Sequence, residues 1–445
     1  MMKTIVIGAG VMGASVAYRL AQAGAAVTVL EATRIGGGTS GISFAWTNAH
    51  KKPPKPYHDL NVAGMKAHAA LADEFGATPW WHGGGSLEWE AEPDRKTQRE
   101  NVEQLQSWGY AAEWITLRQV QELEPDIDPA TIGDAPVAFF PEEGWLDPVV
   151  YAHAMLSAAR HRHGAKIICG ARVVDLITTG DRVTGIRVAD GTQHEADVVV
   201  NCAGRWTNEA TRDAGLHLPL APTVGFLVFT PPVAASLSRV VRTTVIDARP
   251  DGAGRLMLHW NPTDAALSFD TRLSPSMPEA RDLVRRARQL LPSIGEVEPE
   301  AVRIAIRPIP GDHWSAIGPM PRTSGYYIAV THSGVTMSPF LGAAVADEIV
   351  GGRQRSELAH FRPARFFNWP GDANRRGGAE QLRWRFRILL ADRLELRNRN
   401  DLFGVVGRAA SATARWHGPA RQDHGMRPRL HQTRRAFPGR TAPLP

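Results

Sequence analysis

The chain has 445 residues, of which 43% are hydrophobic, so it can bury a large core and is long enough for two or more domains. No uncharged apolar run reaches the length of a membrane span, and the apolar N-terminus leads to Arg19 rather than to a cleavage site, so we expect a cytoplasmic protein. The net charge is +6, but 16 Arg against 6 Asp and Glu lie between Phe367 and Pro445, which leaves −4 for the residues before them.

The first elements predict a dinucleotide site. A run of β-branched residues at 5–7, glycines, and an amphipathic stretch from 14 to 23 predict strand 3–7, helix 11–23 and strand 26–30. Gly8 permits a tight turn, Gly10 lets backbone approach a pyrophosphate, and Gly13 lets the helix pack on the strand. Glu31 closes the second strand, where a carboxylate can accept hydrogen bonds from ribose hydroxyls. NAD and FAD share this fingerprint, so the pattern leaves the choice between them open.

The next part of the chain reads as an insertion. A Gly-rich stretch (35–41) precedes the loop HKKPPKPY (50–57), whose His50, Lys51, Lys52 and Lys55 we interpret as a solvated turn, although they could reach an active-site entrance. The patterns that follow predict a helix at 58–75, a strand pair in WWHGGGSLEW (80–89), a polar helix near 93–108 and a Pro-rich connection at 125–148.

The second half returns to strands and helices. We predict a helix at 147–163, a β-meander closing on a buried strand at 197–201, a second layer of strands and one helix at 216–300, short strands at 302–307 and 326–331, and a turn (331–339) leading into a helix at 340–352. Cys169 and Cys202 lie in separate apolar runs without metal spacing, so we expect two core residues, no disulfide and no metal site. The basic tail has one predicted helix near 378–397, and we interpret the rest as flexible rather than as a nucleic-acid-binding arm.

The chain resembles the FAD-dependent D-amino-acid oxidase superfamily, especially its glycine oxidase and sarcosine oxidase branch. The resemblance spans about residues 3–366 and rests on GAGVMGASVAYRLAQAGAAVTVLEA (8–32), GGGTS (36–40), GWLDP (144–148), VVNCAG (199–204), RPIPGDHWSAIG (307–318) and THSGVTMSPFLGAAVADEI (331–349).

The resemblance implies an α/β fold with a discontinuous Rossmann-type FAD-binding domain and a second α+β substrate domain that carries a mixed or antiparallel sheet. The FAD-binding segments are expected at about 1–78, 145–215 and 305–352, and the substrate-domain segments at 79–144 and 216–304. The oxidoreductase would thus occupy 1–366, and the tail 367–445.

The resemblance also implies the residues around FAD. Thr39 and Ser40 resemble a hydroxylated segment beside the flavin, Val173 a strand position whose backbone meets adenine, and Ala203 and Gly204 the small pair under the cofactor. The turn at 332–337 resembles one whose backbone amides face the flavin ring, where a helix N-terminus stabilises negative charge. The implied FAD contacts are Gly8, Gly10, Val11, Met12, Gly13, Glu31, Ala32, Thr39, Ser40, Val173, Ala203, Gly204, His332, Gly334, Val335, Thr336 and Met337.

For the substrate, the resemblance points to Arg307, because the arginine of the corresponding motif in the glycine oxidase branch binds the substrate carboxylate. A guanidinium fork suits a carboxylate, although an arginine paired with an acid at a domain interface is the alternative. His259 is the second catalytic candidate, since with Trp260 it lies where the substrate sheet of the family runs over the flavin.

Three departures from the family qualify the resemblance. Residues 331–339 contain no cysteine, so FAD is expected to be non-covalent. All seven lysines lie at or before Lys166, so none comes from 216–300 to act over the flavin, and oxygen and a redox partner stay open as acceptors. Glycine oxidase carries an arginine where this chain has Gly334.

The predicted reaction is oxidation of the C–N bond of an amino acid or N-alkyl amino acid (D-amino acid, glycine or sarcosine type) by hydride transfer to flavin N5, with hydrolysis of the imine. The alternatives are oxidation of a hydroxy acid or polyol phosphate, and a non-catalytic FAD-binding subunit of a larger dehydrogenase. The expected partners are the small amino-acid or amine substrate and the electron acceptor, which is oxygen or a redox partner. We expect no binding of nucleic acid, and self-association stays open.

Overall fold

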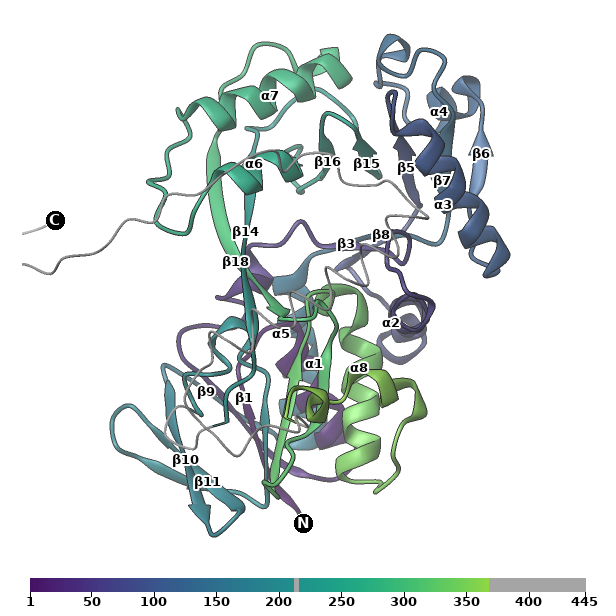
Figure 1. The fold of residues 1–445 in the computed structure, drawn as a ribbon. Coiled ribbons are helices and arrows are strands. Elements are labelled where there is room, and N and C mark those ends of the chain that lie inside the picture. The colour runs from purple at the N-terminus through teal and green to yellow at the C-terminus, as the bar shows by residue number, and fades with distance from the viewer. Residues whose placement is uncertain (212–215, 368–445) are drawn as a thin grey trace, which may run out of the picture. The chain divides into compact units, whose positions relative to one another are not determined.

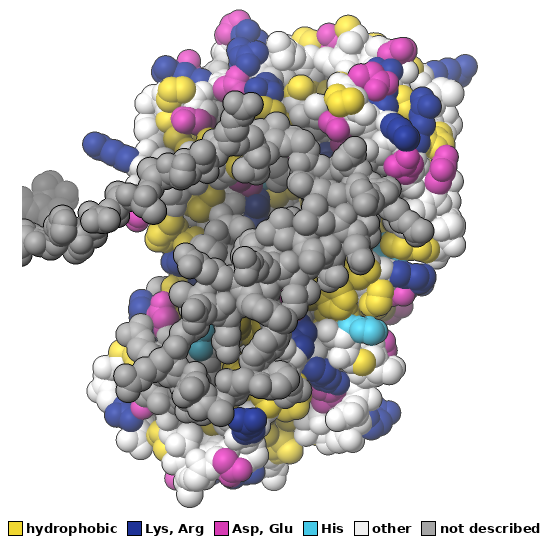
Figure 2. Space-filling view, in the orientation of Figure 1, with side chains coloured by type: hydrophobic (Ala, Val, Ile, Leu, Met, Phe, Trp, Pro, Cys, Tyr) yellow, Lys and Arg dark blue, Asp and Glu magenta, His cyan; other side chains and the backbone are white. Residues whose placement is uncertain are grey.

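Two large sheets organise residues 1–211 and 216–367, the part of the chain that this computed structural model describes (Figure 1). The tail beyond Phe367, with its predicted helix near 378–397, lies outside the described residues. Figure 2 shows side chains of both charge signs mixed over the region of helix α7 (Pro278–Leu290), in keeping with the nearly balanced charge of the main body.

The first sheet carries the predicted dinucleotide unit. Its strands are parallel except for its edge strand β19, and β1 lies between β13 and β2 with Val6 opposite Val200 and Val29. Parallel strands covered on both faces read as continuous apolar runs, which is the pattern of residues 5–7. The sheet order is β19 (Ala316–Pro319), β20 (Tyr326–Val330), β13 (Val198–Asn201), β1 (Lys3–Ile7), β2 (Ala26–Glu31) and β9 (Lys166–Cys169).

The two faces of this sheet are covered differently. Successive side chains of a strand point to opposite faces. Val6 therefore packs with the helices α1 (Val11–Gln22), α5 (Pro148–His163) and α8 (Gly334–Ile349), while Ile5 and Ile7 pack against the meander β10 (Val173–Thr179), β11 (Arg182–Val188) and β12 (Gln193–Glu195). Figure 1 shows α1 and α8 on one side and β10 and β11 on the other.

Helix α8 begins earlier than the sequence predicts, at Gly334 instead of residue 340. Pro339 lies inside it and has no N–H, so the carbonyl of Val335 lacks its partner one turn later. His68 of α2 (Lys55–Phe75) occupies that position, with its Nε2 2.8 Å from the Val335 oxygen. The two helices come this close because a Cβ on Gly64 would lie 2.4 Å from the Thr336 carbonyl oxygen.

The second sheet unites the two predicted substrate-domain segments. Its eight strands, in order, are β18 (Ala301–Pro310), β14 (Leu220–Phe229), β17 (Leu256–His259), β16 (Asp247–Pro250), β15 (Val240–Thr243), β5 (Ser86–Trp89), β7 (Val137–Phe140) and β6 (Glu113–Ile115). The parallel pair β5–β15 joins residues more than 150 positions apart. The sheet is mixed, as predicted, and the long pair β14–β18 runs from it toward the first sheet (Figure 1). The accompanying helices are α3 (Arg95–Ser107), α4 (Leu117–Leu123), α6 (Asn261–Ala266) and α7.

Local pairing differs from the prediction in two places. The expected strand pair at 80–89 is wrong, because β4 (Trp81–His82) joins β8 (Gly144–Leu146) and β3 (Trp46–Thr47) in a small sheet while β5 enters the eight-stranded one. Gly84 and Gly85, both at positive φ, separate the two strands. Strand β9 leaves the meander for the edge of the first sheet, so Cys169 is exposed, contrary to expectation, whereas Cys202 is buried as expected.

Candidate active site

The glycine turn opens a cleft at the carboxyl end of β1. Gly8 has φ +98°, and a Cβ there would lie 2.8 Å from the Cys202 carbonyl oxygen. A Cβ on Gly13 would lie 1.9 Å from the oxygen of Gly8, so helix and strand touch at that point. A Cβ on Gly10 would lie 2.8 Å from Ser40 Oγ, at the mouth of the cleft. Each of the three positions therefore requires glycine for a separate steric reason.

Glu31 lies in the wall of this cleft with its carboxylate fixed in place. One oxygen accepts a hydrogen bond from the Ala9 amide at 2.9 Å, and the other accepts from the amide and hydroxyl of Thr33 at 2.8 and 3.1 Å. A carboxylate oxygen can accept more than one hydrogen bond, so both retain capacity for a ribose diol.

The cleft holds about 260 Å³, and the N-termini of two helices, α1 and α8, open on it. First-turn amides have no acceptor within their helix, and the Val11 amide donates to Ser40 Oγ at 3.1 Å. Gly13, Thr336 and Met337 do not line the cleft: Gly13 packs on Gly8, Thr336 faces a second cavity, and Met337 is fully buried. The predicted residues that line it are Gly8, Gly10, Val11, Met12, Glu31, Ala32, Thr39, Ser40, Val173, Ala203, Gly204, His332, Gly334 and Val335.

A second cavity of about 360 Å³ opens beside the cleft. The two share Thr39, Ser43, Pro308, His332 and Val335, so a molecule in the cavity lies directly against the end of whatever fills the cleft. Thr39 fixes this junction, because its hydroxyl donates to the Ile306 carbonyl of β18 at 2.9 Å.

Arg307 projects from β18 into the cavity and lies over Gly225 of the neighbouring strand. A Cβ at Gly225 would lie 3.0 Å from the Arg307 guanidinium, so the absent side chain makes room for it. Its Nη2 donates to Asp264 Oδ2 at 2.5 Å, and its other donors make no hydrogen bond within the described part of the chain. The predicted alternative of an acid partner is therefore also present, but the pairing uses only one edge of the fork.

His259 stands behind Arg307. Its Nδ1 lies 2.9 Å from Asp247 and its Nε2 2.9 Å from Asp264. Burial by itself lowers the pKa of His259, but the two carboxylates outweigh burial and raise that pKa, so the ring is an imidazolium with both protons donated. Its Nε2 lies 3.2 Å from Arg307 Nη2, two donors converging on one Asp264 oxygen. His259 therefore has no free nitrogen with which to act as a base.

His332 lines both the cleft and the cavity, and Lys52 lines the cavity alone. Burial, with the positive charges of Lys52 and Arg307, lowers the pKa of His332 to about 3, so its ring is neutral. The side chain is nevertheless exposed, because it borders both the cleft and the cavity. Burial, which has the largest effect, and the positive charges of Arg242 and Arg307 together lower the pKa of Lys52 to about 8, although the negative charge of Glu143 opposes them.

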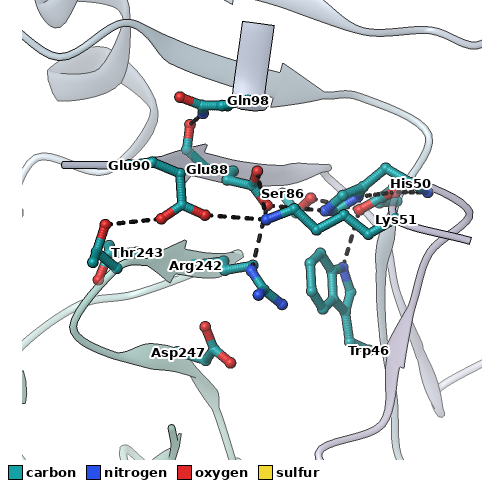
Figure 3. Close-up of polar contacts among 12 residues, drawn as sticks. Trp46, His50, Lys51, Ser86, Glu88, Glu90, Gln98, Arg242, Thr243 and Asp247 are labelled. Carbon is teal, nitrogen blue, oxygen red and sulfur yellow. Dashed lines mark hydrogen bonds and ion pairs between the residues drawn. The ribbon is translucent and has the colours of Figure 1, made fainter. Parts of the chain in front are cut away.

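The far wall of the cavity is a buried network of charges (Figure 3). His50 is 1% exposed and bridges Glu143 at 2.7 Å and Glu88 at 3.1 Å, which raises its pKa although burial alone would lower it. Lys51 contacts Glu88 at 3.0 Å and Glu90 at 3.1 Å. Arg242 places its Nε 3.5 Å from Glu88, and Figure 3 shows its guanidinium extending away from that carboxylate.

The expectation that the loop at 50–57 is a solvated turn is therefore wrong for His50 and Lys52. That expectation holds for Lys55, which pairs with Asp59 on the exposed start of α2, but His50 is buried and Lys52 lines the cavity. The sequence offered a weak signal, which is the gathering of three lysines and a histidine within residues 50–55. The sequence offered no signal for three other charged residues near the cavity, because each is a single charge in an ordinary strand or turn. These are Arg242, Asp247 and Asp264.

The fold and the two joined cavities define a dinucleotide-dependent oxidoreductase, since a Rossmann dinucleotide cleft ends against a cavity built on a separate sheet. The chain belongs to the DAO family of FAD dependent oxidoreductases, whose model matches residues 3–348, and FAD is its cofactor. The glycine cradle, the fixed carboxylate of Glu31 and the two helix N-termini fit a flavin dinucleotide.

Known relatives share most of this length. Glycine oxidase of Bacillus licheniformis is 26% identical over 362 residues, which cover 80% of this chain and 94% of that enzyme. The glycine oxidase structure from Geobacillus kaustophilus covers 82% of this chain and 98% of its own, with a TM-score of 0.71 and 23% identity. The L-proline dehydrogenase structure from P. horikoshii aligns with a TM-score of 0.73 at 21% identity, covering 82% of this chain and 98% of its own.

Residues 1–211 and 216–367 contain neither a membrane-spanning helix nor a metal-binding cluster. None of the helices there is both apolar enough and long enough to cross a bilayer. No cluster of three or more His, Cys, Asp or Glu there has the arrangement of a metal site.

Proposed function

We propose that the protein oxidises the C–N bond of an amino acid or N-alkyl amino acid whose α-carboxylate binds Arg307. The observation that carries the proposal is the Arg307 fork, with free donors in a cavity that adjoins the FAD cleft. Glycine oxidase of Bacillus licheniformis and the glycine oxidase and L-proline dehydrogenase structures support the proposal, since each of these similar proteins is named for an amino acid.

FAD, when bound, supplies the two-electron acceptor for the hydride that leaves the substrate carbon. Arg307 would hold the carboxylate, and the chain Asp247–His259–Asp264 would fix the direction of the guanidinium, so His259 is a positioning residue. Because His332 is neutral, it adds no second positive charge at the junction that would compete with Arg307 for the substrate carboxylate. The imine product is then hydrolysed by water, and the catalysis rests on orientation and electrostatics.

The test is a substrate panel on the purified full-length protein reconstituted with FAD. Anaerobic bleaching of the flavin by glycine, sarcosine or a D-amino acid, but not by hydroxy acids, is expected. Bleaching by hydroxy acids or polyol phosphates alone would favour C–O oxidation, and bleaching by neither would favour a non-catalytic subunit. Arg307→Ala should raise KM for the amino acid about tenfold or more, since a charge-assisted pair is worth about 1.5–3 kcal/mol. An unchanged KM would remove Arg307 from this role.

Two properties of the holoenzyme accompany the proposal. FAD is held without a covalent bond, because residues 331–339 contain no cysteine, and acid precipitation should release all of it. Electrons leave to oxygen or to a redox partner, which oxygen consumption during turnover distinguishes from reduction of an artificial acceptor.

A further inference from the structure

The cavity beside the flavin cleft contains more cationic groups than one α-carboxylate needs. Arg307 and His259 stand at one side and share Asp247 and Asp264, so their charges balance. At the other side His50, Lys51, Lys52 and Arg242 face Glu88, Glu90 and Glu143. Asp247 acts on Arg242 as well as on His259, so the two sides are counted together: with both histidines protonated, they carry six cations against five carboxylates.

The excess charge falls on Lys52. Among the described residues it makes no hydrogen bond and no ion pair, whereas Lys51 beside it is held by Glu88 and Glu90. Lys52 is half-buried and lines the cavity. A sheltered ammonium without a partner is costly unless an anion joins it.

Arg242 adds a second set of donors on the same side. Its Nε is buried without a hydrogen bond, and its terminal nitrogens make none in the described part of the chain. Figure 3 shows the guanidinium extending from Glu88 into the space between Trp46 and Asp247, both of which line the cavity. Arg242, whose Nε lies near Glu88 and whose terminal nitrogens are free to donate, and Lys52, which has no partner among residues 1–211 and 216–367, together suit a carboxylate.

From this arrangement we infer that the cavity binds a second anionic group of the substrate at Lys52 and Arg242, so that the substrate is an amino acid with an additional carboxylate in its side chain or N-substituent. This rests on the proposed function, in which Arg307 holds the α-carboxylate. Both anchors line one cavity of about 360 Å³, so a single molecule can span them.

The direct test measures binding of diacids that the enzyme cannot oxidise. Calorimetry on the FAD-loaded full-length protein would compare malonate, succinate and glutarate with acetate, propionate and butyrate. At least one diacid should bind about tenfold or more tightly than its monoacid, because one additional charge-assisted contact is worth about 1.5–3 kcal/mol. Equal affinities for the two series would overturn the inference.

The variants assign the preference to Lys52. Lys52→Met should bring the ratio of diacid to monoacid affinity close to one, and Lys55→Met, the same substitution on the exposed start of α2, should leave that ratio unchanged. A ratio unchanged in Lys52→Met would refute the assignment. If monoacid and diacid binding fell equally in Lys52→Met, the lysine would act on the α-carboxylate or the cofactor, which also refutes it.

A pH titration of the unmodified protein needs no variant. The groups that face Lys52 are Glu143 before β8, Arg242 on β15, Arg307 on β18 and His332 before α8. Of these groups and Lys52, only Lys52 loses its charge near pH 8, so the diacid preference should fall as the pH rises through about 8 and above. A preference constant from pH 7 to 10 would contradict the inference.

The substrate panel separates the two proposals. Turnover of glycine or sarcosine without preference for acidic amino acids, together with equal diacid and monoacid binding, would refute the second carboxylate and leave C–N oxidation intact. Lys52-dependent diacid binding without bleaching by any amino acid would refute C–N oxidation and leave the anion site intact.

Discussion

Replacing His50 tests the buried charge network that forms the cavity wall. The His50 ring stacks on Phe140, with the ring centroids 4.2 Å apart, and lies between Glu143 and Glu88. The side chains of the histidine and of the two glutamates are at most 3% exposed. His50→Gln keeps a polar side chain but removes the positive charge, which leaves two buried carboxylates short of a partner. Breaking a buried pair in this way costs about 3–5 kcal/mol. With an unfolding entropy of roughly 2.1 cal/mol/K per residue over some 370 residues, that loss corresponds to about 4–6 °C in Tm.

The assay is thermal and urea unfolding of the full-length protein, with His82→Gln as the matched control. His82 lies 3.1 Å from Asp147, as His50 does from Glu88, but its side chain is 35% exposed. An exposed polar contact of this kind contributes at most about 1 kcal/mol, so the control should shift Tm by about 1 °C. Adding Glu143→Gln to His50→Gln should recover part of the loss. Equal small shifts for the two histidine variants would refute the reasoning that burial makes this network essential.

Three other outcomes are expected. Gly10→Ala should weaken FAD binding about tenfold or more in a fluorescence titration of the apoprotein, because the added Cβ would lie 2.8 Å from Ser40 Oγ at the mouth of the cleft. If adding Ser40→Ala to this variant restores the affinity fully, the loss comes from the contact with Ser40 and not from contact of the Cβ with the cofactor. Gly225→Ala should raise KM for the amino acid about tenfold by displacing Arg307, with Tm nearly unchanged, and an unaltered KM would contradict that geometry. Burial lowers the pKa of His68 to about 4, and its Nδ1 is buried without a partner, so the contribution of His68 to stability should be complete above pH 6.5 and should be lost as the pH falls from 6.5 to 4. In urea unfolding, His68→Leu should reduce the dependence of the free energy of unfolding on pH in this range. An unchanged dependence would assign it to other groups.

The sequence by itself determined the dinucleotide half of the site. Gly8, Gly10 and Gly13 answer to local steric requirements within one strand, turn and helix, and Glu31 follows from where the next strand ends, so a contiguous stretch carries the whole signal. Strands β1, β2, β13 and β20 and helices α1 and α5 were predicted for the same reason, since hydrophobic period is a local property. The start of α8 was missed because Gly334 and Pro339 resemble a turn, and only the contact from His68 shows how the helix tolerates the proline.

Only the tertiary structure decided what surrounds the substrate cavity. Its wall is assembled where β5 pairs with β15, which brings Glu88 beside Arg242 across more than 150 residues of sequence, and the loop carrying His50 and Lys52 then closes over them. No local pattern encodes such a meeting, because each strand alone shows one charge among apolar neighbours. Whether a charged side chain is solvated or buried depends on what the rest of the chain places over it, which is why a loop that reads as a solvated turn provides the unpaired cation of the cavity.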